Sequence, residues 1–538
     1  MAPIKPSPEP QTKVTDADSE IEEAKRRYKS SKSLKSRLSS VGTTVIVGLV
    51  SLIAGTKLPA IPSHVSPPAL QQCINAVCQA MDGGVDQCVR YPGDGDFFSW
   101  VNPYNKARPL VPAAVVKPAN KELVAGIVRC AAQNGKRVQA KSGGHSYANY
   151  GLGGDNGTVA IDLENLAYVI VDETTHKAKI GGGSRLGAID EQMGDRAFAH
   201  GVCPGVGIGG HATIGGLGPM SRMWGSTLDH ILEVEVVTAN GTIVRASETQ
   251  NADLFWAVRG AGASFGIVTE FVMKTHKKPT EAISFTQRIP WSDIDDMVST
   301  FQAWQHLIAE PSLDPKFGTE FELNKHGAKI KGTYYGTMDQ FKASAIKKRL
   351  PNINPTRDSL VNTMLSWVDS AELVLSDVPT EFYSRSLGLK ASDLLSPAAT
   401  KTLFQYIHDA NSEANVRWFV IFDATGGAVA NVAQDATAYA HRDKVMFYQS
   451  YAFNILTAFT PAAQDFLDSI HGAVLSGVPD GFVRTTYPGY VDPQLGDFDA
   501  QKVYWGTNLA RLEQVKKAWD AEDVFHNPQS VRPAVDAV

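Results

Sequence analysis

Three glycine-rich stretches lie within the first 270 residues, and they constrain the fold of this chain more than any other feature. They read SGGHSY (142–147), GVGIGGHATIGGLG (205–218) and RGAGASFGIV (259–268). Glycine permits sharp turns and lets a backbone lie close to a bulky neighbour. One such stretch alone indicates a tight turn between strands. Three of them favour a nucleotide-like cofactor whose phosphates accept hydrogen bonds from backbone N–H groups.

The second stretch matches the dinucleotide fingerprint G-x-G-x-x-G from Gly205 to Gly210. That fingerprint needs an apolar strand directly before it and a helix directly after it. The preceding residues are AFAHGVCP and the following ones are HATIGGLGP, so we expect neither flank to fit. We therefore set an NAD site aside.

The residues around the first stretch predict a strand, a helix and a second strand. The helix is expected from Asn120 to Asn134, because Leu123, Ile127 and Cys130 recur on one helical face. Two NGT triplets, at Asn156 and Asn240, lie between strand-like segments. They predict hairpin turns and, in a lumenal protein, glycosylation sites.

The length of 538 residues suits two or three domains. A formal net charge of −5 without a basic stripe in the body of the chain makes nucleic acid an unexpected partner. The strand–helix alternation changes near Glu281 and the glycine loops become rarer, which indicates a second domain. The expected parts are a polar basic tail (1–40), an apolar signal-anchor or signal segment (41–55), a linker (56–69), a cofactor-binding domain (70–279), a substrate domain (280–484) and a C-terminal segment that returns to the cofactor domain (485–538).

The N-terminal segment predicts a membrane anchor. Residues 38–55 carry no charge and would span about 27 Å as a helix at about 1.5 Å per residue. The long basic stretch before them favours an uncleaved signal-anchor with a cytosolic tail and a lumenal or extracellular catalytic domain. A cleaved signal peptide, which would give a secreted protein, and a buried core helix are the alternatives.

The chain contains five cysteines, and Cys73, Cys78, Cys88 and Cys130 lie in its first 130 residues. These four could form two disulfides in an oxidising compartment. The fifth, Cys203, lies in the second glycine-rich region. No CxxC or HExxH motif indicates a metal site, so no metal is expected.

Several long motifs in a fixed order resemble one known family. They are SGGHSY, GVCPGVGIGG, NADLFWAVRGAGASFGIVTEF, TAYAHRD and the C-terminal YWGTNLARLEQVKKAWDAEDVFHNPQSV. Together they resemble the berberine-bridge-enzyme-like FAD-linked oxidoreductases of the vanillyl-alcohol-oxidase (PCMH-type FAD-binding) superfamily, and most of all the glucooligosaccharide oxidase type. The resemblance runs from about Leu70 to Val531. It implies an α+β fold with a two-part FAD-binding domain, an antiparallel-sheet substrate domain with helices, and a berberine-bridge-like C-terminal segment that completes the FAD domain.

The resemblance also implies how the cofactor is held. Family members often tether FAD twice, which assigns His145 to the 8α-methyl carbon and Cys203 to C6. Noncovalent FAD is the alternative. Imidazole and thiolate are both nucleophiles, and the flavin edge is electrophilic. The family pairing implies the disulfides Cys73–Cys130 and Cys78–Cys88. The other expected FAD-binding residues are Ser142, Gly143, Gly144, Ser146, Gly205, Gly207, Gly209, Gly210, Thr213, Gly215, Gly216, Gly262, Gly266, Ile267, Asn508 and Asn527.

For catalysis, a base must take the hydroxyl proton while the C–H hydrogen leaves as hydride. In the resembling sugar oxidases a Tyr does this work beside an Asp, which here implies Tyr490 and Asp423. The neighbouring Tyr487 does not match, and Tyr147 matches a substrate-facing Tyr. Without the resemblance, each of these residues would be read as an ordinary core or turn residue.

Two departures from the sugar oxidases bear on the substrate. Ile421 stands where they carry a polar residue, and Gly489 where they carry asparagine. We therefore expect an oxidase that takes hydride from a hydroxyl-bearing carbon of a secondary metabolite and passes electrons to O2. An oligosaccharide oxidase that forms a lactone is the first alternative, and a dehydrogenase or a flavin-binding protein without oxidase turnover is the second. A monomer that contacts the membrane only through its N-terminal segment is expected.

Overall fold

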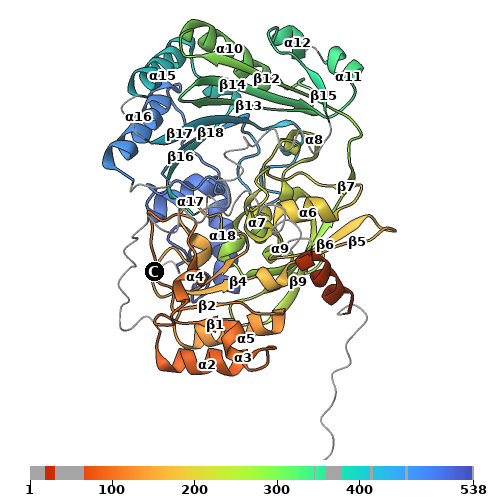
Figure 1. Cartoon of the computed structure of the whole chain (residues 1–538), viewed down its shortest axis with the longest axis vertical. Coiled ribbons are helices and arrows are strands. Elements are labelled where there is room, and N and C mark those ends of the chain that lie inside the picture. Colours follow the sequence, from red (N-terminus) through yellow and green to blue (C-terminus); the bar gives the residue numbers. More distant parts are fainter. Residues whose placement is uncertain are drawn as a thin grey trace, which may run out of the picture.

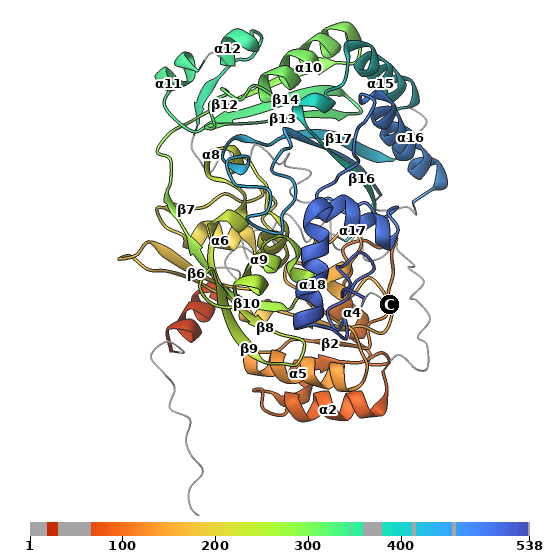
Figure 2. The same cartoon turned by 180° about the vertical axis from the view of Figure 1, so that it is seen from behind.

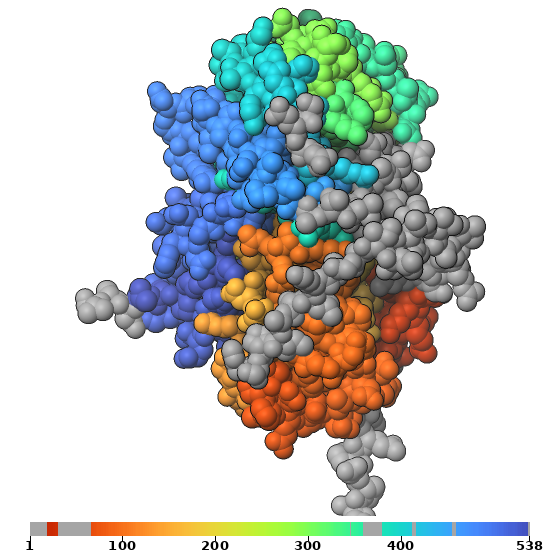
Figure 3. Space-filling view, turned by 60° about the vertical axis from the view of Figure 1, so that its left-hand side comes forward, coloured from red at the N-terminus to blue at the C-terminus, as the bar shows by residue number. Residues whose placement is uncertain are grey.

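The computed structural model describes residues 19–30, 66–344, 346–358, 379–411, 416–454 and 459–535. The proposed anchor at 41–55 and most of the tail and linker around it lie outside these ranges. The described chain has two main parts, with the second above the first in the figures (Figure 1). In the space-filling view, the green and cyan residues of the second part lie above the orange residues of the first (Figure 3).

The first part begins with a four-stranded sheet in the order β1-β2-β4-β3. Its strands are β1 (Val89–Arg90), β2 (Ala114–Val116), β4 (Val159–Asp162) and β3 (Val138–Lys141). Helix α5 (Lys121–Gln133) connects β2 to β3, and the Asn120 side chain accepts a hydrogen bond from the N–H of Leu123 at its start. This confirms the predicted strand–helix–strand unit, and the buried face of α5 includes Ile127 and Cys130 as expected.

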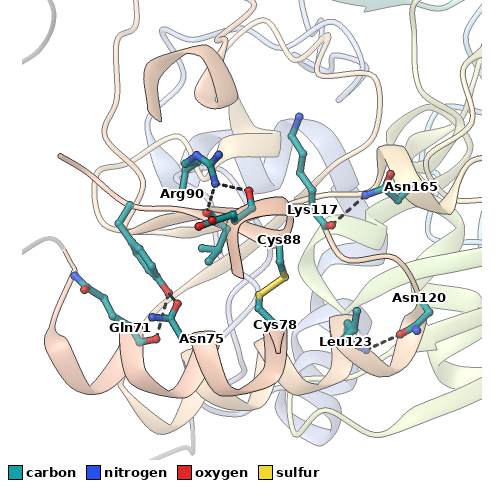
Figure 4. The surroundings of a disulfide bond; sticks show 12 residues. Gln71, Asn75, Cys78, Cys88, Arg90, Lys117, Asn120, Leu123 and Asn165 are labelled. Carbon is teal, nitrogen blue, oxygen red and sulfur yellow. Dashed lines mark hydrogen bonds between the residues drawn. A yellow bond between two sulfur atoms is a disulfide. The ribbon is translucent and has the colours of Figure 1, made fainter. Parts of the chain in front are cut away.

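Two disulfides secure α2 (Pro68–Cys78) to this unit. Cys73 pairs with Cys130 of α5, and Cys78 pairs with Cys88 at the end of α3 (Gly84–Cys88). Both implied pairings are therefore confirmed. Figure 4 shows the second bridge, with Arg90 on β1 close by.

A five-stranded antiparallel sheet completes the first part in the order β5-β6-β10-β8-β9. Its strands are β5 (Val169–Val171), β6 (Lys177–Gly181), β10 (Ile267–Lys274), β8 (Ile231–Val237) and β9 (Ile243–Ser247). Asn240 lies in the turn between the antiparallel strands β8 and β9, so the predicted hairpin is confirmed. The hairpin predicted at Asn156 is wrong. It lies between β3 and β4, which run parallel and therefore require a crossover connection.

The second part is a seven-stranded antiparallel sheet in the order β15-β12-β14-β13-β17-β18-β16. Its strands are β15 (Thr356–Asp358), β12 (Ala282–Pro290), β14 (Gly327–Tyr334), β13 (Phe317–Asn324), β17 (Arg417–Ala424), β18 (Met446–Asn454) and β16 (Glu381–Leu389). Helices α10 (Ile294–Ile308), α15 (Pro397–Ala410) and α16 (Pro461–Gly477) pack beside this sheet (Figure 1). Alternate strand residues such as Phe321 and Phe422 join their apolar core, so the intervening residues point to the opposite face.

The C-terminal segment returns to the first part, as expected (Figure 2). The indole N–H of Trp505 donates to the carbonyl of Gly260 in α9 (Ala252–Ala261) over 3.0 Å. The helical stretch of this segment ends at Trp519 and is divided into α17 (Asp497–Trp505) and α18 (Leu509–Trp519). The division falls at Gly506, whose φ of 47° does not fit an α-helix.

Residues 19–30 form a helix that packs on the first part (dark red in Figures 1 and 2). Ala24 and Tyr28 are buried on one face of it. The Tyr28 hydroxyl accepts from the Arg185 N–H over 2.8 Å, and the Lys25 ammonium donates to the Ala119 carbonyl over 3.0 Å. Within the described ranges, we find no helix with the length and hydropathy needed to span a bilayer.

Candidate functional site

A cavity of about 480 Å³ lies where the two parts meet, a size typical of small-molecule sites. The first part contributes the glycine loops around Gly144 and Gly207 to its lining. The second part contributes β17 and β18, with Asp423 and Gln449 among the residues that face it.

The two glycine loops pack directly on each other. A Cβ atom at Gly143 would lie 2.3 Å from the backbone nitrogen of Gly207, and one at Gly207 would lie 2.0 Å from the nitrogen of Gly143. Side chains are therefore excluded at both positions by loop–loop contact. Gly210 differs because it lines the cavity, and nothing lies within 4 Å of a Cβ placed there.

His145 and Cys203 line the same cavity, although 57 residues separate them in sequence. The His145 ring stacks on Tyr104 with 4.9 Å between centroids. Cys203 belongs to neither disulfide and is partly exposed. The structure thus places His145 and Cys203, the two nucleophiles that the family resemblance assigned to FAD, in one cavity.

Tyr490 and Asp423 meet at the end of the cavity that β17 forms. The Tyr490 hydroxyl donates to Asp423 Oδ2 over 3.0 Å, and the Gln449 amide donates to the same oxygen. Burial raises the pKa of Asp423 to about 6, against the lowering effects of the bonds from Tyr490 and Gln449. Burial also raises the pKa of Tyr490 well above its usual value, and the nearby Asp423 charge adds to that. The pair is therefore a neutral phenol donating to a carboxylate near neutral pH.

The other two tyrosines named in the sequence are placed differently. The Tyr147 hydroxyl lies 2.9 Å from that of Tyr451, and Tyr147 lines the cavity. The Tyr487 hydroxyl accepts the N–H of Gly216 over 2.7 Å. The Tyr487 hydroxyl is thus bonded to the backbone, whereas the Tyr490 hydroxyl bonds to Asp423, as the family resemblance implied.

Most of the expected FAD-binding residues lie at cavities. Those that line the main cavity are Ser142, Gly143, Gly144, His145, Ser146, Cys203, Gly207, Gly210, Thr213 and Asn527. A small adjoining cavity is lined by Gly209, Gly262, Gly266 and Ile267, together with Gly210 and Thr213.

Four expected residues lie outside both linings: Gly205, Gly215, Gly216 and Asn508. The Asn508 amide donates to the carbonyls of Thr437 and Ala438, so it secures a loop instead of facing the cavity. Gly216 has a φ of 78°, and a Cβ there would meet Thr227, which accounts for the glycine without a ligand.

Sequence reasoning missed the wall that the second part supplies. Its residues are Glu320, Phe382, Phe419, Gln449, Tyr451 and Phe453, joined by Tyr104 from the first part. The strand residues of this wall alternate in sequence with buried core residues, and that alternation is the signal that could have identified them. It becomes useful only once the face of the sheet that borders the cavity is known.

One of the two arguments against an NAD site is also wrong. Helix α7 (Ile208–Ile214) does follow the G-x-G-x-x-G stretch directly. The other argument holds, because the preceding strand β7 (Arg196–Ala197) ends well before Gly205 and forms a two-stranded sheet with β11 (His276–Lys277). The stretch therefore lacks the strand that a Rossmann turn requires.

Two protein families match parts of this chain. Residues 112–247 match an FAD binding domain, and residues 486–532 match the family described as berberine and berberine like. The FAD-linked oxidoreductase sorD of Penicillium rubens is 36% identical over 84% of this chain and 96% of its own length. The chain belongs to the berberine-bridge-like FAD-linked oxidoreductases. It is an FAD-dependent enzyme of the oxidase type.

Two solved structures share its fold. Xylooligosaccharide oxidase from Myceliophthora thermophila C1, in complex with xylobiose, is 32% identical, has a TM-score of 0.79 and covers 87% of this chain and 100% of its own. Glucooligosaccharide oxidase from Acremonium strictum, described with a 6-S-cysteinyl, 8α-N1-histidyl FAD, is 30% identical with a TM-score of 0.77 and the same coverage.

The cavity fits the cofactor of this family. Glycine backbone at one end leaves room for phosphates to approach, and His145 and Cys203 offer two nucleophiles beside it. The Tyr490–Asp423 pair lies on the substrate-domain side of the same space.

Proposed function

We propose that this enzyme oxidises a hydroxyl-bearing carbon of an apolar secondary metabolite, with Tyr490 and Asp423 as its catalytic residues. The observation that carries the proposal is the 3.0 Å hydrogen bond from Tyr490 to Asp423 inside the cavity. Bound FAD supplies the hydride acceptor and passes the electrons on to O2.

Tyr490 and Asp423 act together as a proton relay, in which Tyr490 contacts the substrate hydroxyl and Asp423 is the final acceptor. Burial disfavours a free tyrosinate, because it raises the pKa of Tyr490 well above its usual value. Tyr490 therefore takes the proton of the substrate hydroxyl as it gives its own proton to Asp423. The net change is one proton moved from substrate oxygen to carboxylate, with no charge left on the phenol.

The walls of the cavity favour an apolar substrate body. Tyr147 and Phe382 lie with 4.7 Å between ring centroids, as do Phe419 and Tyr451. Ile421 on β17 adds an aliphatic surface. It pairs with Glu322 of β13 on one side and with Gln449 of β18 on the other. These rings and Ile421 give this side of the cavity a surface against which an apolar substrate body can pack.

Oxidation of an oligosaccharide at its anomeric carbon is the second candidate. It is supported by relatives such as the xylooligosaccharide oxidase of Thermothelomyces thermophilus, which is 35% identical over 80% of this chain and 90% of its own length. Gln449 and Glu320 give the cavity the hydrogen-bonding groups that a sugar would use.

We propose two covalent bonds to FAD, through His145 and Cys203. Both line the cavity, and the Acremonium strictum relative is described with a cysteinyl and a histidyl bond. We further propose that the catalytic domain is lumenal or extracellular and glycosylated at Asn156 and Asn240, both of which are exposed. The two disulfides support an oxidising compartment.

Anaerobic bleaching of the flavin tests the proposed function. The holoenzyme is mixed with hydroxylated aromatics and polyketides, and separately with xylobiose and chitobiose. Bleaching by the first group only is expected, and bleaching by the sugars only would replace the proposal with the second candidate. Tyr490→Phe and Asp423→Asn should each slow bleaching by about 10²–10⁴-fold with flavin content retained. Tyr487→Phe is the matched control and should slow it far less.

A further inference from the structure

The face of the substrate sheet beside the cavity carries a row of buried charges that the mechanism above does not use. Glu320 and Glu322 lie on β13, and Lys329 and Lys331 lie on β14. Lys331 Nζ lies 3.0 Å from Glu320 and 3.1 Å from Glu322, and Lys329 Nζ lies 2.8 Å from Glu322. All four residues are at most 6% exposed.

Asp423 extends this row by one more carboxylate. The antiparallel register of β13 and β17 places Glu320 directly opposite Asp423. Side chains at such positions point to the same face with Cβ atoms about 4.5–5.5 Å apart. Both residues line the cavity. Three carboxylates therefore meet two ammonium groups, and all of these residues are buried except Asp423, which is half-buried.

Among the described residues the charges do not balance when every group is ionised, because three negative charges face two positive ones. An unmatched charge in a low-dielectric site is costly, and a proton on one carboxylate removes it. Glu322 is well satisfied, since it pairs with both lysines and accepts from the Asn324 amide over 2.9 Å. Glu320 shares Lys331 with it. The proton therefore belongs to the Glu320–Asp423 pair.

We propose that Glu320 and Asp423 share one proton, and that Glu320 and Lys331 are positioning residues that keep Asp423 ionised to accept the proton from Tyr490. The inference rests on the catalytic role proposed for Asp423. Burial raises the pKa of Glu320 to about 7 and that of Asp423 to about 6, which agrees with a proton held mainly on Glu320. As the pH falls, a second proton enters the pair, Asp423 becomes neutral, and the acceptor is lost.

Three tyrosines of the described residues also lie around Asp423, and they do not compensate for Glu320 or Lys331. Tyr490 lies in the C-terminal segment, Tyr451 on β18 and Tyr147 after β3, and burial raises the pKa of all three well above the usual value. They remain neutral in the working range. Within the part of the chain that the structure describes, the nearby charges that act on Asp423 are thus those of β13 and β14.

The test is the pH dependence of flavin bleaching in the holoenzyme, with the compound that bleaches the wild type as probe. Glu320→Gln is uncharged, like the protonated Glu320 of the wild type, so it should leave the acid limb, the loss of bleaching at low pH, at its wild-type position. Lys331→Met removes a positive neighbour and should move the acid limb about 1 pH unit higher. An acid limb that Lys331→Met does not move, or that Glu320→Gln moves clearly lower, would overturn the inference.

Glu322→Gln is the matched control, because it makes the same substitution at a carboxylate that stays ionised, two residues further along β13. It should move the acid limb lower, and an equal or larger downward shift in Glu320→Gln would mean that Glu320 is ionised and holds no shared proton. Infrared difference spectra between the wild type and Glu320→Gln, recorded at a pH above the acid limb, give a second readout that needs no turnover. A protonated carboxylic acid band should be present in the wild type and lost in Glu320→Gln, and a band unchanged by that substitution would contradict the sharing. This readout also applies where Lys331→Met does not fold.

The two proposals can fail separately. If Asp423→Asn bleaches as fast as the wild type, the catalytic role of Asp423 is wrong and this inference falls with it. If Asp423→Asn is inactive and Lys331→Met keeps the wild-type acid limb, or Glu320→Gln moves it clearly lower, only this inference is wrong.

Discussion

At the scale of single residues, position in the cavity decides what chemistry a side chain can do. Tyr487 and Tyr490 are three residues apart, but one bonds to the backbone of Gly216 and the other to Asp423. His145 and Cys203 are common residue types, and their proposed role depends on the cavity that both of them line. Their separate placement allows the two proposed covalent bonds to be removed one at a time.

Removal of both nucleophiles should release the flavin on denaturation. His145→Ala and Cys203→Ala should each keep yellow colour in the denatured chain, because one bond remains, and the double variant should lose it. The measurement is flavin absorbance of the protein fraction after acid precipitation, with the native absorbance showing that each variant still binds FAD. Colour that stays with the denatured double variant would show that another residue forms the bond.

At the scale of elements, the sequence predicted what depends on local pattern. The period of α5, the β8–β9 hairpin and the glycine loops were all readable, because capping, turn chemistry and helical spacing are local. The crossover at Asn156 and the wall formed by Phe419 and Tyr451 were not, because strand direction and the choice of sheet face depend on distant partners. Asn508 was assigned from the family motif, and only the fold shows that it holds a loop.

The glycine loops give a prediction at this scale. Gly207→Ala should destabilise the fold itself, because its Cβ would lie 2.0 Å from the Gly143 nitrogen. Gly210→Ala is the matched control, since its Cβ meets no protein atom within 4 Å and points to the space where the cofactor is expected. Thermal unfolding of both flavin-free variants should show a lower Tm for Gly207→Ala alone, while flavin content should fall in both. Equal Tm values would contradict the loop-packing argument.

At the scale of the whole molecule, the helix at residues 19–30 decides how the chain can meet a membrane. Its buried face is fixed to the FAD domain by the Tyr28 and Lys25 hydrogen bonds. A single crossing at 38–55 would place a hydrocarbon layer of about 30 Å between this helix and the domain. A cytosolic tail and the docked helix therefore exclude each other, and cleavage after residue 55 would remove the helix from the chain.

The docked helix predicts that the mature protein keeps residues 19–30, in the same compartment as its catalytic domain. The full chain is expressed in a secretory host with one tag at each end, and sealed microsomes are treated with protease. Both tags should survive until detergent is added, and the mass of the intact protein should include residues 19–30. Tyr28→Ala, which removes the buried ring, should make the N-terminal region more susceptible to protease once the microsomes are opened, whereas Arg27→Ala on the exposed face should not. Digestion of the N-terminal tag alone in sealed microsomes would instead establish the single anchor with a cytosolic tail, and would show that the contacts of Tyr28 and Lys25 do not form in the membrane-bound protein.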